Sequence, residues 1–152
     1  MKMFGKDLTK NSILFILNKI KVEDRIKLMK LMFFVEHYDV RTSKLSLNKT
    51  LGNNFVIYHY GPFSFEVYKK FLELVNDGDI IEGPFIKSNV ELKEVRTNLP
   101  PEIYEKIEFV LKKFGNLTGK ELEIKSLEML GIKPEEKSKF FGLPVEVMIS
   151  KM

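Results

Sequence analysis

The chain contains no cysteine, which excludes disulfide bonds, thiolate nucleophiles and cysteine metal sites together. Alanine, glutamine and tryptophan are also absent, whereas lysine, glutamate, isoleucine and phenylalanine are plentiful. Few thermolabile side chains and much Lys and Glu are typical of thermophilic proteins, and an AT-rich genome produces much of the same bias. No apolar run approaches the roughly 20 residues that a membrane-spanning helix needs.

The amino terminus lacks the apolar core and the small-residue cleavage site of a signal peptide. We therefore expect a cytoplasmic protein with no membrane partner. At 152 residues, 44% of them hydrophobic and 30% charged, the chain has the composition of an ordinary soluble globular protein. Its length predicts one domain over residues 1–152, and it is also compatible with a homodimer.

Positive charge is concentrated in the first third of the chain. Residues 1–50 carry eleven Lys or Arg against five Asp or Glu, whereas residues 101–152 carry nine of each. A basic first third suits either a nucleic acid or an acidic protein partner, and a solvated lysine surface is the simpler interpretation.

Apolar periodicity and end signals predict the elements. We expect helices over 10–19, 24–38, 64–77, 101–114 and 118–130, an extended segment over 55–60, and a β-hairpin over 80–92. The helix over 24–38 is apolar around most of its circumference, which predicts a central, buried position. The fold class is therefore mainly α (α+β), a compact arrangement of about five helices with one small β-hairpin.

The first 95 residues have a winged-helix-like order, in which the helix before the hairpin would enter the DNA major groove. That helix carries three acids and two lysines outward, a poor surface for phosphate. A nucleic-acid-binding regulator would instead use the basic first third. Its candidate residues are Lys19, Lys21, Arg25, Arg41, Lys44 and Lys49.

Lys27 and Lys30 interrupt the most apolar helix at a spacing that places them on one side, and His37 continues the same stripe. Two interpretations remain open. The stripe is a narrow polar strip for a protein partner, or it is the solvent edge of a core helix whose lysine stems cover apolar neighbours.

Residues 58–64 form the most distinctive local motif, Tyr-His-Tyr-Gly-Pro-Phe-Ser. Alternation in an extended segment would place Tyr58 and Tyr60 on one side and His59 on the other. Gly61 and Pro62 would then fix a turn, and Ser64 or Pro62 would begin the next helix. The motif is either a structural corner or a rigid aromatic contact surface for another protein.

No catalytic centre is visible in the sequence. His37 and His59 are the only histidines and match no metal-ligand spacing. No serine stands in a Gly-flanked nucleophile elbow, and no glycine-rich loop could hold a phosphate. We therefore predict a protein that is not an enzyme and that has no metal site and no cofactor.

The lysine–leucine helix and the later Tyr-Gly-Pro turn resemble the Panacea domain of SocA-type antitoxins and the related YwgA-like family of small prokaryotic proteins. The matching positions lie between residues 10 and 95. They are Lys27, Leu28, Lys30, Leu31, Tyr60, Gly61, Pro62, Phe63, Ser64, Leu74, Gly78, Asp79 and Ile80. Met29 stands where family members often have glutamine, and residues 123–126 lack the family's Thr-His pair.

The resemblance implies a small, mostly helical, non-enzymatic domain that neutralises a toxin by direct protein contact. Our leading hypothesis is therefore an antitoxin-like or adaptor module that binds a protein partner. Its predicted partner-binding residues are Lys27, Lys30, His37, Tyr58, His59, Tyr60, Gly61, Pro62 and Ser64. Residues 100–152 would form carboxy-terminal helices packed on this core.

Overall fold

The structure is a computed structural model that describes residues 7–152. Most of the signal-peptide expectation rests on residues 1–6, which lie outside this range. The helices are α1 (Leu8–Lys19), α2 (Arg25–His37), α3 (Phe65–Asn76), α4 (Leu92–Thr97), α5 (Pro101–Phe114), α6 (Gly119–Met129), the 3₁₀ helix η1 (Pro134–Phe140) and α7 (Val145–Ile149). The strands are β1 (Tyr38–Asp39), β2 (Lys44–Leu45), β3 (Val56–Tyr58), β4 (Gly61–Phe63), β5 (Ile80–Glu82) and β6 (Ile86–Ser88).

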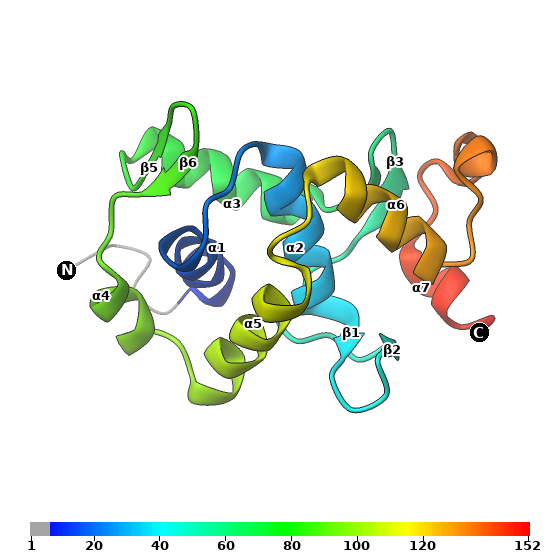
Figure 1. Cartoon of the computed structure of the whole chain (residues 1–152), viewed down its shortest axis with the longest axis horizontal. Helices are drawn as coiled ribbons and strands as arrows, with labels where there is room; N and C mark the ends of the chain where they lie inside the picture. Colours follow the sequence, from blue (N-terminus) through cyan, green and yellow to red (C-terminus); the bar gives the residue numbers. More distant parts are fainter. Residues whose placement is uncertain (1–6) are drawn as a thin grey trace.

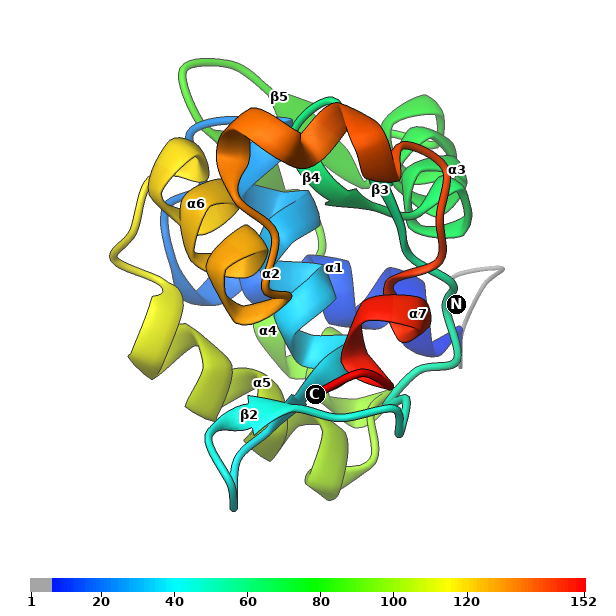
Figure 2. The same ribbon diagram turned by 90° about the vertical axis from the view of Figure 1, so that its right-hand side faces the viewer.

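Helix α2 is the centre of the molecule, as its apolar circumference predicts. Every residue from 27 to 37 is buried, and α1, α3, α5 and α6 all pack against this helix (Figures 1 and 2). The ring of Phe34 stacks on Phe114 of α5 with centroids 4.1 Å apart. The mainly α class with some β structure is confirmed. Among residues 7–152, no helix has both the length and the apolar character to cross a membrane.

The helix ends follow the capping residues of the sequence. Asp7, Asp24 and Ser64 each accept a hydrogen bond from a backbone N–H in the first turn of α1, α2 and α3, respectively. Thr118 and Glu121 form the predicted capping box at the start of α6. These local signals set the boundaries of the four helices to within about two residues of prediction.

The β structure differs from the prediction of one hairpin. Three separate two-stranded antiparallel sheets are present, β1–β2, β3–β4 and β5–β6. The predicted second strand over 90–92 is wrong because the chain turns immediately after β6. The Ser88 hydroxyl accepts from the Val90 N–H at 3.0 Å and donates to the Val90 carbonyl oxygen at 2.7 Å. The short helix α4, which was not predicted, follows this turn.

The order of elements remains winged-helix-like, with β1–β4 inserted between α2 and α3. Val22, between α1 and α2, makes a single bridge to Ile86 of β6, and the Ile86 N–H donates to the Val22 carbonyl oxygen at 2.8 Å. The β5–β6 hairpin is thus held against the start of α2.

The carboxy-terminal segment returns to the other hairpin, β3–β4. Backbone hydrogen bonds join Ile57 to Gly142 and Leu143, and Val145 donates to the Phe55 carbonyl oxygen. Residues 142–145 therefore lie alongside β3 (Figure 2). The position of β3–β4 depends on chain from both halves of the sequence.

Candidate functional site

The β3–β4 hairpin has its turn at His59 and Tyr60, because Tyr58 pairs directly with Gly61. The sequence placed the turn at Gly61 and Pro62, and that prediction is wrong, since both residues belong to β4. Gly61 has φ +88°, a backbone conformation that favours glycine and that closes the two-residue turn. The predicted alternation also fails beyond the strand, since the rings of Tyr58 and His59 lie 4.6 Å apart.

A pocket of about 360 Å³ lies between this hairpin, the first half of α2 and α3. We call it the aromatic pocket. Its lining residues are Arg25, Ile26, Met29, Lys30, Tyr58, His59, Tyr60, Phe63 and Tyr68. The volume falls within the usual range of ligand pockets, and the lining is mostly apolar. The pocket therefore brings the lysine helix and the Tyr-Gly-Pro motif together.

Lys30 is the buried cation in the lining of the aromatic pocket. Its side chain is 1% exposed, and Nζ donates to the Pro62 carbonyl oxygen at 2.9 Å. Burial lowers the pKa of Lys30 to about 8, an effect that Lys137 increases and that Glu123 and Asp24 partly oppose. The pocket thus combines a buried lysine ammonium group with a lining of aromatic side chains.

Arg25 holds the rim of the pocket. Its guanidinium donates twice to the Glu82 carboxylate of β5, at 2.6 and 2.8 Å, and once to the Tyr68 hydroxyl at 2.9 Å. The hydrogen bonds from Arg25 hold the pKa of the Glu82 carboxyl below its ordinary value. The bidentate pair joins α2 to the β5–β6 hairpin, and the bond to Tyr68 joins the same arginine to α3.

The hairpin is braced on its other side by α6 and η1. Lys137 donates to the His59 carbonyl oxygen and to Glu123 Oε2, the latter at 2.8 Å. Glu123 is 4% exposed, and its Cγ lies 3.4 Å from the place a Cβ on Gly61 would occupy. The turn is consequently fixed between α2 and the carboxy-terminal helices.

Aromatic side chains gather on the outside of the hairpin. We call Tyr58, His59, Tyr60, Phe65 and Phe141 the aromatic surface. All five are exposed, and the exposed fractions of the four Tyr and Phe residues run from 38% for Phe141 to 62% for Phe65. The Tyr58 ring lies about 6 Å from both Phe65 and Phe141. Large, rigid aromatics in one exposed patch are typical of protein contact sites.

The predicted polar stripe on α2 does not reach the surface. Lys27 is 3% exposed and lies under the start of α6, with Nζ 3.5 Å from Glu23. His37 is fully buried. The expectation of a solvent edge is therefore wrong for all three residues, because helix α6, the β3–β4 hairpin and the 38–50 loop cover that side of the helix. Gly61, Pro62 and Ser64 are buried as well.

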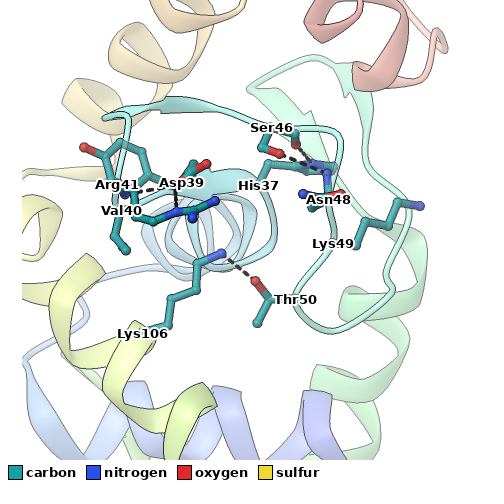
Figure 3. Close-up of a pocket in the computed structure, with 10 residues that line it drawn as sticks. His37, Asp39, Val40, Arg41, Ser46, Asn48, Lys49, Thr50 and Lys106 are labelled. Atoms are coloured by element: carbon teal, nitrogen blue, oxygen red, sulfur yellow. Dashed lines mark hydrogen bonds and ion pairs between the residues drawn. The ribbon is translucent and has the colours of Figure 1, made fainter.

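His37 belongs to a different pocket, at the carboxyl end of α2 (Figure 3). This pocket measures about 220 Å³ and is lined by the 38–50 loop and Lys106 of α5. The Nδ1 atom of His37 lies 2.8 Å from the Ser46 carbonyl oxygen, and Nε2 has no partner among the described residues. Burial lowers the pKa of His37. The structure thus separates His37 from Lys30 and from the hairpin.

The six basic candidates for nucleic-acid binding lie on both ends of α2. Arg25 is paired with Glu82, Lys19 lies 3.3 Å from Glu108, and Lys49 lies 3.1 Å from Glu146. Lys21 lies over the Phe85 ring, whereas Arg41 and Lys44 are exposed in the β1–β2 hairpin beyond the other end of α2. Helix α2 is about 20 Å long, so these side chains do not form one continuous stripe.

A scan against protein families confirms the Panacea resemblance. The family described as "Antitoxin SocA-like, Panacea domain" matches residues 28–129, about two thirds of the chain. This chain belongs to the SocA-like Panacea family. Neither the curated proteins nor the solved structures give a match to the chain. The family match begins later than the resemblance over residues 10–95 but extends further towards the carboxyl end, where it includes α5 and all of α6.

Sequence reasoning missed several residues of the site in this Panacea domain. Glu123 and Lys137, which brace the turn, carry no local signal because their contacts span many residues of chain. Phe141 likewise reaches the hairpin only through the return of the carboxy-terminal segment. Phe63 and Phe65 could have been found, since they continue the aromatic run from Tyr58.

Gly61 offers a test of how strongly the turn fixes this site. Replacing Gly61 by alanine is expected to lower the free energy of unfolding by about 1–2 kcal/mol, because an L-residue is strained at φ +88°. Its Cβ would itself meet only ordinary contacts of 3.4–3.5 Å. Urea unfolding followed by circular dichroism measures the effect. Gly83→Ala is the matched control, because Gly83 has no positive φ and a Cβ added there would have no neighbouring atom closer than 4.0 Å. Equal losses in the free energy of unfolding for the two variants would contradict the explanation by backbone strain at Gly61.

Proposed function

We propose that this Panacea domain is a non-enzymatic binding module that acts on a protein partner by direct contact, as an antitoxin or an adaptor. The observation that supports this function is the aromatic surface on a hairpin braced from both sides. Tyrosine and phenylalanine bury large areas with little loss of side-chain entropy, so a rigid group of them favours tight protein contact. The family description supplies the antitoxin class, and a toxin is the partner that it suggests.

The contact would be made by Tyr58, His59 and Tyr60, the three predicted partner-binding residues that are exposed. Lys27, Gly61, Pro62 and Ser64 would act indirectly, by positioning the hairpin and the adjoining helices. His37 lies in the other pocket and has no part in this contact surface.

A pull-down with the tagged full chain from the native host tests the proposal. Tyr60→Ser is expected to reduce recovery of a stoichiometric protein partner about tenfold or more, because Tyr60 is 58% exposed at the turn of the β3–β4 hairpin. Leu47→Ser is the matched control, since Leu47 is 51% exposed beside the β1–β2 hairpin and away from this surface. Nuclease treatment of half of each sample separates direct protein contact from contact through nucleic acid. Mass spectrometry of the partner then distinguishes a toxin from another protein.

The opposite outcome would be equal recovery with Tyr60→Ser and Leu47→Ser, or loss of every protein partner after nuclease treatment. The second of these results would favour a nucleic-acid-binding regulator, the alternative suggested by the winged-helix-like order and the Val22–Ile86 bridge. That regulator would lose DNA affinity steeply between low and moderate salt. A second copy of the chain as the only partner would appear as a dimer in light scattering.

A further inference from the structure

The ammonium group of Lys30 is only partly satisfied by the protein. An ammonium group carries three N–H donors, and among residues 7–152 the structure gives Nζ one hydrogen-bond acceptor, the Pro62 carbonyl oxygen. The side chain is 1% exposed and nevertheless lines the aromatic pocket. A buried charge with unused donors is costly, so it is retained most readily where a ligand completes it.

Among residues 7–152, no carboxylate accepts a hydrogen bond from Lys30. The lining of the aromatic pocket contains two cations, Lys30 and Arg25, and no acid. Two acids near Lys30, Glu123 and Asp24, do not line the pocket, and each accepts a hydrogen bond from another group. Glu123 accepts from Lys137 at 2.8 Å, and Asp24 caps α2 through the Lys27 N–H at 2.8 Å. Arg25 is already paired with Glu82, so Lys30 is the cation left to bind an acceptor.

We propose that the aromatic pocket receives an Asp or Glu side chain of the protein partner, whose carboxylate accepts from Lys30 Nζ. This inference rests on the proposed function and names the chemistry of the partner at the same site. Met29, Phe63 and Tyr68 would enclose the apolar part of the segment that carries the acid. Tyr58 and Tyr60 line the pocket and are exposed, so the same contact would also bury part of the aromatic surface. A pocket of about 360 Å³ has room for a carboxylate side chain and part of an apolar neighbour.

The binding of two capped dipeptides tests this assignment without the native partner. The probes are N-acetyl-phenylalanyl-glutamate amide and its glutamine counterpart, which differ only in the carboxylate. Binding to the full chain is followed by nuclear magnetic resonance with lysine labelled at Cε. The glutamate dipeptide is expected to bind about tenfold more tightly than the glutamine dipeptide, because only it makes a charge-assisted hydrogen bond. It should also raise the pKa of Lys30 above about 8.

Two variants separate the local effect from net charge. Lys30→Met should bind both dipeptides equally weakly, and because it removes a buried charge its fold should be retained. Lys44→Met removes one charge from the exposed β1–β2 hairpin and should leave the preference for glutamate unchanged. Equal affinities in the unaltered protein, no detectable binding of the glutamate dipeptide at millimolar concentration, or an undiminished preference in Lys30→Met would each overturn the assignment. Such a result would leave the effect of Tyr60→Ser on partner recovery untouched.

Discussion

Replacing Glu36 by glutamine is expected to lower the free energy of unfolding by about 3 kcal/mol. The Glu36 carboxylate is fully buried and accepts three backbone hydrogen bonds from the loop after β2. Leu51 and Gly52 donate to Oε2 at 2.5 and 3.0 Å, and Asn53 donates to Oε1 at 2.8 Å. A glutamine amide offers one oxygen and places an NH₂ group against the remaining N–H. Lost bonds to a charged acceptor and an unpaired buried donor each cost roughly 1–3 kcal/mol.

The effect of Glu36→Gln is measured by urea unfolding, with Glu108→Gln as the matched control. Glu108 pairs with Lys19 near the surface, so its change should cost less than about 1 kcal/mol. Hydrogen exchange supplies a second readout, since the amides of Leu51, Gly52 and Asn53 should lose protection in Glu36→Gln alone. A loss of stability as small as that of Glu108→Gln would show that the carboxylate does not anchor the loop.

Replacing Lys30 should change stability in opposite directions depending on the new residue. Lys30→Met is expected to raise the free energy of unfolding at pH 7 by about 1–2 kcal/mol. The difference between the ordinary pKa of 10.5 and about 8 corresponds to roughly 3 kcal/mol, at about 1.4 kcal/mol per pH unit. In Lys30→Met the Pro62 carbonyl oxygen would lose its hydrogen-bond donor. This loss costs about 1–2 kcal/mol and reduces the gain in stability by that amount. Lys30→Glu should lower stability by about 3 kcal/mol or more, because it buries an acid beside Glu123.

The pH dependence of the Lys30→Met effect has a definite sign. The folded-state pKa lies below the unfolded-state value, so between pH 8 and 10.5 the unfolded chain binds more protons than the native protein. The contribution of Lys30 to stability therefore improves as the pH rises through this window. The advantage of Lys30→Met should shrink over the same window and be gone above it.

Urea unfolding at pH 7 and near pH 10.5 measures this difference. Lys44→Met serves as the reference for an exposed lysine and should change stability by less than about 0.5 kcal/mol at both pH values. A Lys30→Met variant less stable than the unaltered protein at pH 7 would contradict the account of a poorly satisfied buried cation.

Local signals in the sequence predict the helices well. Asp24, Ser64 and Thr118 are side chains that bond to the first turn of their own helix, so their effect depends on a few neighbouring residues. The central position of α2 also follows from the sequence, because its apolar residues cover most of the circumference. The Panacea resemblance rests on this helix being followed in the sequence by the Tyr-Gly-Pro motif. The family match over residues 28–129 confirms the resemblance.

The environment of the lysines could not be predicted in the same way. Lysine is rarely buried, so Lys27 and Lys30 were both expected near water. Their burial results from segments distant in sequence, the start of α6 over Lys27 and the β3–β4 hairpin over Lys30. The turn at His59 and Tyr60 was missed for a related reason. Gly-Pro is an ordinary end signal for an extended segment, and only the pairing of Tyr58 with Gly61 shows that β4 begins there.

The return of residues 142–145 to β3 has a consequence for the free edge of that strand. The family match ends at residue 129, yet the backbone groups of β3 that face away from β4 are occupied by chain beyond that point. A fragment trimmed to the matched residues would therefore present an open strand edge next to several exposed aromatic rings. Open edges of this kind recruit strands from other molecules and lead to aggregation. Residues 142–145 thus cover this strand edge in the full chain and leave the aromatic rings of the hairpin exposed.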